Sequence, residues 1–161
     1  MKVIVSIMGV LLTGYGLLAS ASVEQRGTTP EGFLQEWASG LSEGNVDDMT
    51  AFYEDSKDTL AIQSSGHMRK GTAEIRKEYQ SAFEEVIFER VTLRDLTVRQ
   101  NRAVAWATCR FKALTLHKVK NTKWTLEVYT SFVLRRSGKT WKIVLEQSTP
   151  IAGVPRVSPR E

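Results

Sequence analysis

The spacing of apolar residues changes once along this chain, and the change limits the folds that it can adopt. Before Glu85, large apolar side chains recur every four residues, as in Phe33, Trp37 and Leu41, which is the repeat of one buried helix face. After Glu85, apolar and polar residues alternate through four long segments, which is the repeat of β-strands. Helices followed by long antiparallel strands predict an α+β domain with the helices packed on one face of a curved sheet.

Local signals mark the ends of three expected helices. Thr29 is a hydroxyl cap ahead of Pro30, which suits the first position of a helix. Gly44 is expected to end this helix, and Asn45 can cap a shorter second one. A third helix is expected after the turn at Lys70-Gly71-Thr72. Its buried face carries Ile75, Tyr79 and Phe83.

One short and four long strands are expected around these helices, within a single domain at residues 30–150. The short strand is Thr59 to Gln63, and residues 64–70 are expected to form a loop. Gln100-Asn101 and Ser137-Gly138-Lys139 are expected as hairpin turns. The long strands are expected at about Phe88–Arg99, Arg102–His117, Lys123–Arg136 and Thr140–Thr149.

The N-terminus has the pattern of an export signal. Lys2 gives a positive start, Val3 to Leu18 form an apolar run, and Ala19-Ser20-Ala21 has the small-x-small form that signal peptidase recognises. The apolar run is shorter than the roughly 20 residues that span a bilayer, and no basic cluster follows it. We therefore expect cleavage after Ala21, a tether at residues 22–29 and a flexible tail at residues 151–161. The mature protein is expected to be secreted or periplasmic, with no membrane span.

Composition and motifs argue against several specific functions. The net charge is +4 with 25% charged residues, and acids lie between the basic residues, so nucleic acid is not an expected partner. The sequence has no P-loop, G-x-G-x-x-G, zinc-type spacing or G-x-S-x-G elbow, so neither a cofactor nor a metal is expected. The single cysteine, Cys109, has apolar neighbours and is expected to be a buried strand thiol.

The order of these elements resembles the SnoaL-like, nuclear-transport-factor-2-like family. The resemblance covers about Pro30 to Pro150 and implies a cone-shaped, curved antiparallel sheet packed by three N-terminal helices, with a pocket between them. It also implies dimerisation through the outer face of the sheet. The motifs that carry it are Trp37 followed by Gly44-Asn45-Val46-Asp47, the pair Phe52-Tyr53, Lys70-Gly71 ahead of Ile75, and the final run from Ser137 to Val144.

Two features differ from the pattern of this family. Members often carry a histidine near the end of the last strand, where this sequence aligns Gln147. Glutamine forms hydrogen bonds but has no proton chemistry near neutral pH. The cyclases and isomerases of this fold also use a buried acid as a base, and no aspartate lies deep in an apolar strand here. Both features count against those reactions.

His67 is the one weak catalytic candidate. It lies in the expected loop at residues 64–70, at the expected mouth of the cone, and could move a proton or contact a ligand. The alternative is an ordinary solvated loop histidine. No other residue is assigned a catalytic role from the sequence.

The alternating pattern does not decide which side chains of the strands face the pocket and which face outward. Arg110 and Glu127 either pair across neighbouring strands on the outer face or hold a polar ligand in the pocket. Ala105, Cys109 and their alternate neighbours form a small apolar face that suits packing under the helices. Trp106 is then exposed on the other face, which predicts a homodimer interface there.

Several aromatic residues are candidates for the wall of a ligand pocket, although their spacing also fits an ordinary core. Gln147, His67, Arg110 and Glu127 are the polar candidates that accompany them. The aromatic candidates are Trp37, Tyr53, Tyr79, Phe83 and Tyr129.

Three functions remain open at this point. The first is an exported homodimeric binding protein that holds a small apolar or amphipathic molecule in its cone. The second is a cofactor-independent isomerase, dehydratase or hydrolase, and the third is a structural dimerisation module. An enzyme requires a titratable group buried beside the aromatic wall, whereas a binding protein requires only a sizeable dry pocket.

Overall fold

The computed structural model describes residues 27–152. The predicted signal peptide, residues 1–21, lies outside the described residues, as do residues 22–26 of the tether and residues 153–161 of the tail. No helix between residues 27 and 152 is long and apolar enough to cross a membrane.

The described chain forms three helices and one six-stranded sheet. The helices are α2 (Pro30–Glu43), α3 (Val46–Ala51) and α4 (Thr72–Glu85). The strands are β1 (Leu60–Ile62), β2 (Met68–Lys70), β3 (Val86–Asn101), β4 (Val104–His117), β5 (Thr122–Ser137) and β6 (Thr140–Pro150).

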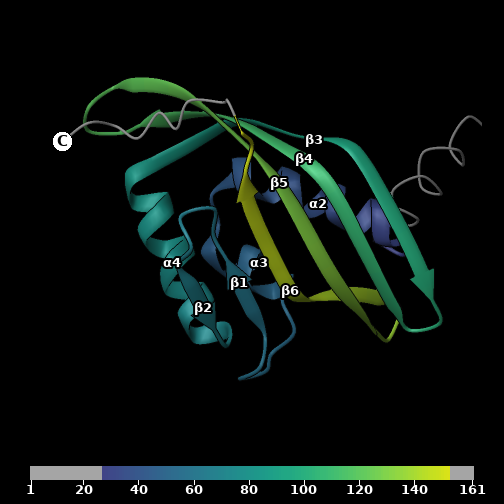
Figure 1. Ribbon diagram of the computed structural model, residues 1–161. Helices are drawn as coiled ribbons and strands as arrows, with labels where there is room; N and C mark the ends of the chain where they lie inside the picture. The colour runs from purple at the N-terminus through teal and green to yellow at the C-terminus, as the bar shows by residue number, and fades with distance from the viewer. Residues whose placement is uncertain (1–26, 153–161) are drawn as a thin grey trace, which may run out of the picture.

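The sheet is curved and unclosed, and its strands lie in the order β2-β1-β6-β5-β4-β3. Strand β1 runs parallel to β6, and every other neighbouring pair is antiparallel. Figure 1 shows α2 behind the long strands and α4 beside the short strands β1 and β2. This arrangement confirms the predicted α+β cone.

The helix ends follow the predicted capping signals. The Thr29 hydroxyl accepts a hydrogen bond from the backbone N–H of Gly32 at 3.1 Å. Gly44 ends α2 in the left-handed region at φ 68°, where glycine avoids the steric cost of a side chain. The Asn45 side chain accepts hydrogen bonds from the first turn of α3. Two features differ from expectation: residues 68–70, expected in a loop, form β2, and the β3–β4 turn lies two residues later than expected.

Strand β4 shows which face of the sheet meets the helices. Ala105, Cys109 and Phe111 are buried on the inner face, whereas Trp106 is exposed on the outer face. Trp37 of α2 packs edge-on against Phe132 of β5 on this inner face, at 5.1 Å between ring centroids. The predicted packing of this face under the helices is therefore confirmed, as is the buried Cys109 thiol.

Strand β6 contains a β-bulge at Val144. Leu134 of β5 pairs with Ile143, but the preceding residue, Val133, pairs with Leu145. Val144 is therefore the extra residue of the bulge, with no partner of its own on β5.

The bulge changes which side chains of β6 face the helices. Trp141 and Ile143, before the bulge, are fully buried on the inner face. After the bulge, Glu146 and Ser148 take the inner face and line a cavity. Gln147 is instead exposed on the outer face. A regular strand would have placed Gln147 inside, because side chains alternate strictly along an unbroken strand.

Candidate functional site

A cavity of about 560 Å³ lies between the inner face of the sheet and the helices. This volume is within the range of about 300–1,000 Å³ that is typical of small-molecule sites. Its wall is mainly apolar and aromatic, with polar groups along the side formed by α4, β1 and β6. The largest apolar side chains in the wall are Trp37, Phe88, Phe111, Trp124 and Leu126.

A chain of hydrogen bonds runs from the core into this cavity and ends at Glu146. The Trp37 indole N–H donates to the Tyr79 hydroxyl at 3.3 Å. The hydroxyls of Tyr79 and Tyr53 lie 2.7 Å apart, and the Tyr53 hydroxyl donates to Oε2 of Glu146. Because Tyr53 gives its proton to the carboxyl group, Tyr79 must donate to Tyr53. Every donor in the chain therefore points toward Glu146.

The carboxyl group of Glu146 has a raised pKa. Burial raises its pKa from 4.5 to about 7, and the hydrogen bond from Tyr53 opposes part of that rise. Desolvation disfavours the charged carboxylate, which is the physical reason for the direction. The hydrogen bond that Glu146 accepts from the described residues is on Oε2, which leaves the second oxygen, Oε1, available, and the residue lines the cavity. At neutral pH this group can therefore both accept and donate a proton.

The neighbours of Glu146 stay protonated. Burial, followed by the charge of Glu146, raises the pKa of the Tyr53 hydroxyl well above its ordinary value. Burial also raises the pKa of Tyr79. The Cys109 thiol has a pKa raised to about 12, by burial first and by Glu146 second. Glu146 is therefore the group near the tyrosines that changes charge near neutral pH.

A pair of hydroxyls lies on the same inner face as Glu146. Thr130 Oγ1 and Ser148 Oγ are 3.0 Å apart, and both residues line the cavity. Ser148 follows Glu146 by two residues on the same face of β6, about 7 Å along the strand. This pair adds hydroxyl groups to the part of the cavity wall that the sheet forms.

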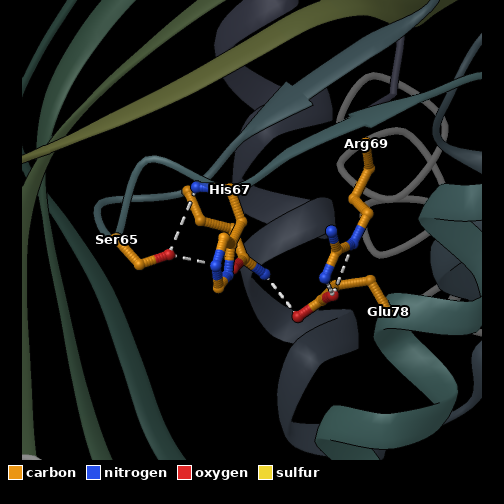
Figure 2. Close-up of polar contacts among 5 residues, drawn as sticks. Ser65, His67, Arg69 and Glu78 are labelled. Atoms are coloured by element: carbon orange, nitrogen blue, oxygen red, sulfur yellow. Dashed lines mark hydrogen bonds and ion pairs between the residues drawn. The ribbon is translucent and has the colours of Figure 1, made fainter.

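A second polar cluster lies where the β1–β2 hairpin meets α4 (Figure 2). Arg69 of β2 reaches Glu78 of α4, with its Nε donating to Oε2 at 2.8 Å. The Gln63 side-chain amide donates to the other carboxylate oxygen of Glu78. All three residues line the cavity, together with Ser64 and Ser65.

The structure brings three of the sequence candidates into the cavity wall. Trp37, Tyr53 and Tyr79 meet there through the hydrogen bonds described above. Phe83 is buried behind the wall, with its ring 5.7 Å from that of Tyr79 and 6.1 Å from that of Phe88. It supports the wall without lining the cavity.

His67 lies outside the cavity wall. It is exposed in the β1–β2 hairpin, and its backbone N–H donates to the Ser65 hydroxyl at 3.4 Å (Figure 2). Its position is that of the solvated histidine that the sequence left as the alternative. Among residues 27–152, no three His, Cys, Asp or Glu side chains gather in a way that could hold a metal ion.

The remaining candidates lie on the outer face of the sheet. Arg110 and Glu127 form an ion pair there at 2.5 Å, which is the cross-strand alternative rather than the pocket alternative. Tyr129 is directly opposite Arg110 and is 52% exposed. Gln147 also lies on this face, because the bulge at Val144 turns it outward. Trp106, on the same face, is 49% exposed. None of these five residues lines the cavity.

Glu146 is a candidate functional residue that was not named from the sequence. The sequence suggested that the buried acid of this fold was lacking, because no aspartate lay deep in an apolar strand. The structure shows a buried glutamate in the cavity wall instead, one residue before the position aligned with the family histidine. No sequence signal pointed to it, because its inward direction depends on the bulge at Val144 and no turn residue marks that position.

Comparison with known proteins agrees with the fold. No protein of curated function matches this sequence. A ketosteroid isomerase-like protein from Erwinia carotovora atroseptica has a similar structure, with a TM-score of 0.66 and 17% identity over 80% of this chain and 98% of that one. A proposed scytalone dehydratase from Novosphingobium aromaticivorans superposes with a TM-score of 0.68 and 11% identity, covering 84% of this chain and 98% of that one.

A third similar structure has a different kind of description. It is a proposed calcium/calmodulin-dependent protein kinase II association domain from Xanthomonas campestris, with a TM-score of 0.65 and 15% identity, covering 96% of this chain and 100% of that one. At these identities the likeness shows the fold alone. Residues 31–152 match the family model of the SnoaL-like domain. The chain therefore belongs to the SnoaL-like domain family, with the nuclear-transport-factor-2-like fold.

Proposed function

We propose that this protein is a cofactor-independent enzyme that transfers a proton on a small, mostly apolar molecule, as an isomerase or a dehydratase does. The observation that supports it is the Glu146 carboxyl group, which lines an apolar cavity with a pKa of about 7. A carboxyl group with a pKa near the working pH is suited to general acid–base catalysis. It meets the requirement that separates an enzyme of this fold from a simple binding protein.

The proposed chemistry uses the two oxygens of Glu146 differently. The hydrogen bond from Tyr53 holds Oε2 and fixes the plane of the carboxylate. Oε1 is then available to take a proton from a carbon beside a carbonyl group of the substrate. In an isomerase the same oxygen returns the proton to another carbon. In a dehydratase, loss of hydroxide from the neighbouring carbon completes the elimination, and the proton from Glu146 converts it to water.

The names of similar structures are compatible with this proposal. One is described as ketosteroid isomerase-like and another as a proposed scytalone dehydratase. The proposal for this chain rests on Glu146 and the tyrosines beside it, because a shared fold does not by itself define a reaction.

A test of this function measures hydrogen exchange in D2O. The wild-type protein is incubated with a panel of small apolar ketones, and loss of the α-proton is followed by NMR. We expect a rate that rises with pH through about 7 and falls by roughly 10²- to 10⁴-fold in Glu146→Gln. Gln147→Ala is the matched control, because this neighbour lies on the outer face. Equal exchange by wild type and Glu146→Gln would overturn the proposal.

The second candidate is a binding protein without catalysis. It is favoured by the mainly apolar wall of the cavity, and by the hydroxyl protons of Tyr53 and Tyr79, which are already committed within the chain. Binding of the same ketones without Glu146-dependent exchange would support it. Export and homodimerisation are further proposals. The mass of the mature chain, isolated from the envelope fraction of the source cells, tests cleavage after Ala21.

A further inference from the structure

The polar cluster of Gln63, Arg69 and Glu78 is not used by the proton-transfer proposal. Within the cluster, both Arg69 and Gln63 donate hydrogen bonds to Glu78. Arg69 contacts Oε2 of Glu78 through both Nε and Nη2, each at 2.8 Å. Gln63 donates to Oε1 of Glu78. Both carboxylate oxygens are thus engaged, and Glu78 fixes the plane of the guanidinium group.

The guanidinium group of Arg69 keeps free donors in this cluster. A guanidinium group has five N–H donors, and Glu78 engages Nε and Nη2. No residue that the structure describes bonds Nη1 of Arg69. The side chains of Arg69 and Glu78 are 32% and 30% exposed, so the pair is reachable from the cavity that it lines. A ligand group that meets the free N–H groups of Arg69 must therefore be an acceptor.

The sheet register places Arg69 at a fixed distance from Glu146. Ala61 of β1 is paired with Arg69 of β2 on one side and with Glu146 of β6 on the other. Residues directly opposite each other in a sheet point to the same face, so all three side chains point into the cavity side. Adjacent strands are about 4.8 Å apart, which puts the Arg69 and Glu146 backbones about 10 Å apart.

Ala61 leaves the space between the two groups open. Its side chain is a single methyl group, and it lines the cavity. Phe88, Trp124 and Leu126 add apolar surface to the wall of the same cavity. A molecule in this space would therefore have an apolar body, one end at Glu146 and an acceptor group at Arg69.

From this geometry we propose that Arg69 is the binding site for a carboxylate at one end of the ligand, so that the substrate class is a small amphipathic carboxylic acid. A carboxylate matches the planar fork of a guanidinium group with two parallel hydrogen bonds, which a neutral carbonyl cannot form. This inference rests on the proposed function in one respect: the ligand occupies the same cavity as Glu146.

The test uses two probes that differ only at the acceptor end. These are 4-phenylbutanoate and its neutral amide, 4-phenylbutanamide, titrated into the whole mature protein by calorimetry at pH 6. At this pH Glu146 is mostly neutral, because its pKa is about 7. We expect the wild type to bind the carboxylate roughly tenfold or more tightly than the amide, which is the usual size of a charge-assisted pair.

Three variants identify the group responsible. Arg69→Met is expected to remove the preference, because it weakens carboxylate binding far more than amide binding. Arg69→Lys keeps the charge without the fork and is expected to retain part of the preference. Arg135→Met is the matched control, because Arg135 forms its ion pair with Glu54 away from the cavity wall. A thermal melt of each variant confirms that it is folded.

The outcomes separate this inference from the proposed function. Equal binding of the two probes by wild type, a preference that survives in Arg69→Met, or no binding of either at millimolar concentration overturns the carboxylate site. A preference lost in Arg69→Met supports it, even if hydrogen exchange proves independent of Glu146. In that case the proposed catalysis fails and the protein is a binding protein for carboxylic acids.

Discussion

Arg69 on β2 and Glu146 on β6 point to the same face of the sheet, and only the strand β1 lies between them. One is a permanent cation held by Glu78, and the other is a carboxyl group that titrates near neutral pH. Their separation of about 10 Å is set by two strand spacings rather than by flexible loops. The polar ends of the cavity are therefore fixed by the backbone of the sheet.

Stability is expected to fall as the pH rises, because of Glu146. Folding raises the pKa of this group from 4.5 to about 7, so the folded state holds the proton more tightly than the unfolded chain does. The contribution is fully present below pH 4.5 and is lost as the pH rises through about 7, a decline on the order of 3 kcal/mol in the free energy of unfolding. Urea unfolding at a series of pH values measures it.

Glu146→Gln provides the comparison for this pH dependence. The amide keeps an acceptor for Tyr53 and cannot ionise. The difference in unfolding free energy between variant and wild type should therefore grow in favour of the variant between pH 5 and pH 8. Parallel curves across this range would show that Glu146 is solvated rather than buried.

Tyr53→Phe is expected to raise the pKa of Glu146 further. The Tyr53 hydroxyl donates to the carboxyl group and lowers its pKa, so removal of that hydrogen bond favours the protonated form. The carboxyl carbon of labelled glutamate in an NMR titration reports the shift. Tyr129→Phe, on the outer face, should leave the titration unchanged, and a shift of the same size there would contradict this assignment.

The bulge at Val144 predicts the result of exchanging two neighbouring side chains. In the double variant Glu146→Gln and Gln147→Glu, the carboxyl group moves to the outer face, where it is exposed. Its pKa should return to about 4.3, the value of an unperturbed glutamate. The same NMR titration measures it. A midpoint that stays near 7 would mean that the strand slips to bring position 147 inside.

We expect two copies of the protein to associate through the outer face of the sheet, more strongly at high salt concentration. Trp106 is an exposed aromatic there, but Arg94 lies directly opposite Arg110 on the same face, and contact between two copies would bring these cations together. Sedimentation should show more dimer at high ionic strength, and less in Trp106→Ala. Val119→Ala, in the β4–β5 turn, is the control. An unchanged profile in Trp106→Ala would remove this face as the interface.

Cys109 is expected to resist modification in the folded protein. Its thiol is buried, and its pKa is raised to about 12, so the reactive thiolate is scarce at pH 8. A thiol reagent should react slowly with the native protein and rapidly in urea. Fast reaction with the native protein would indicate that the inner face opens to solvent.

Much of the fold followed from the order of residues alone. Four-residue spacing set the helices, alternation set the long strands, and Thr29, Gly44 and Asn45 set helix ends that the structure confirms. These signals are local, since each depends on side chains within one or two turns of helix or along one strand. Trp37 and Tyr79 lie in the cavity wall for the same reason, because their helical spacing identified the face that turns inward. Tyr53 also lies in the wall, but it follows the end of α3 and is placed by its bridge to Ile143.

The chemistry of the cavity was decided by tertiary structure. Glu146 faces inward, and Gln147 outward, because one extra residue in β6 reverses the alternation, and the sequence carries no mark of that residue. Arg69 and Glu146 face each other across Ala61 only because β1 pairs in parallel with β6 while β2 folds back on β1. The sequence by itself determined the elements and their buried faces. Strand pairing, which depends on contacts between distant segments, determined which polar groups share a cavity and how burial shifts the pKa of Glu146.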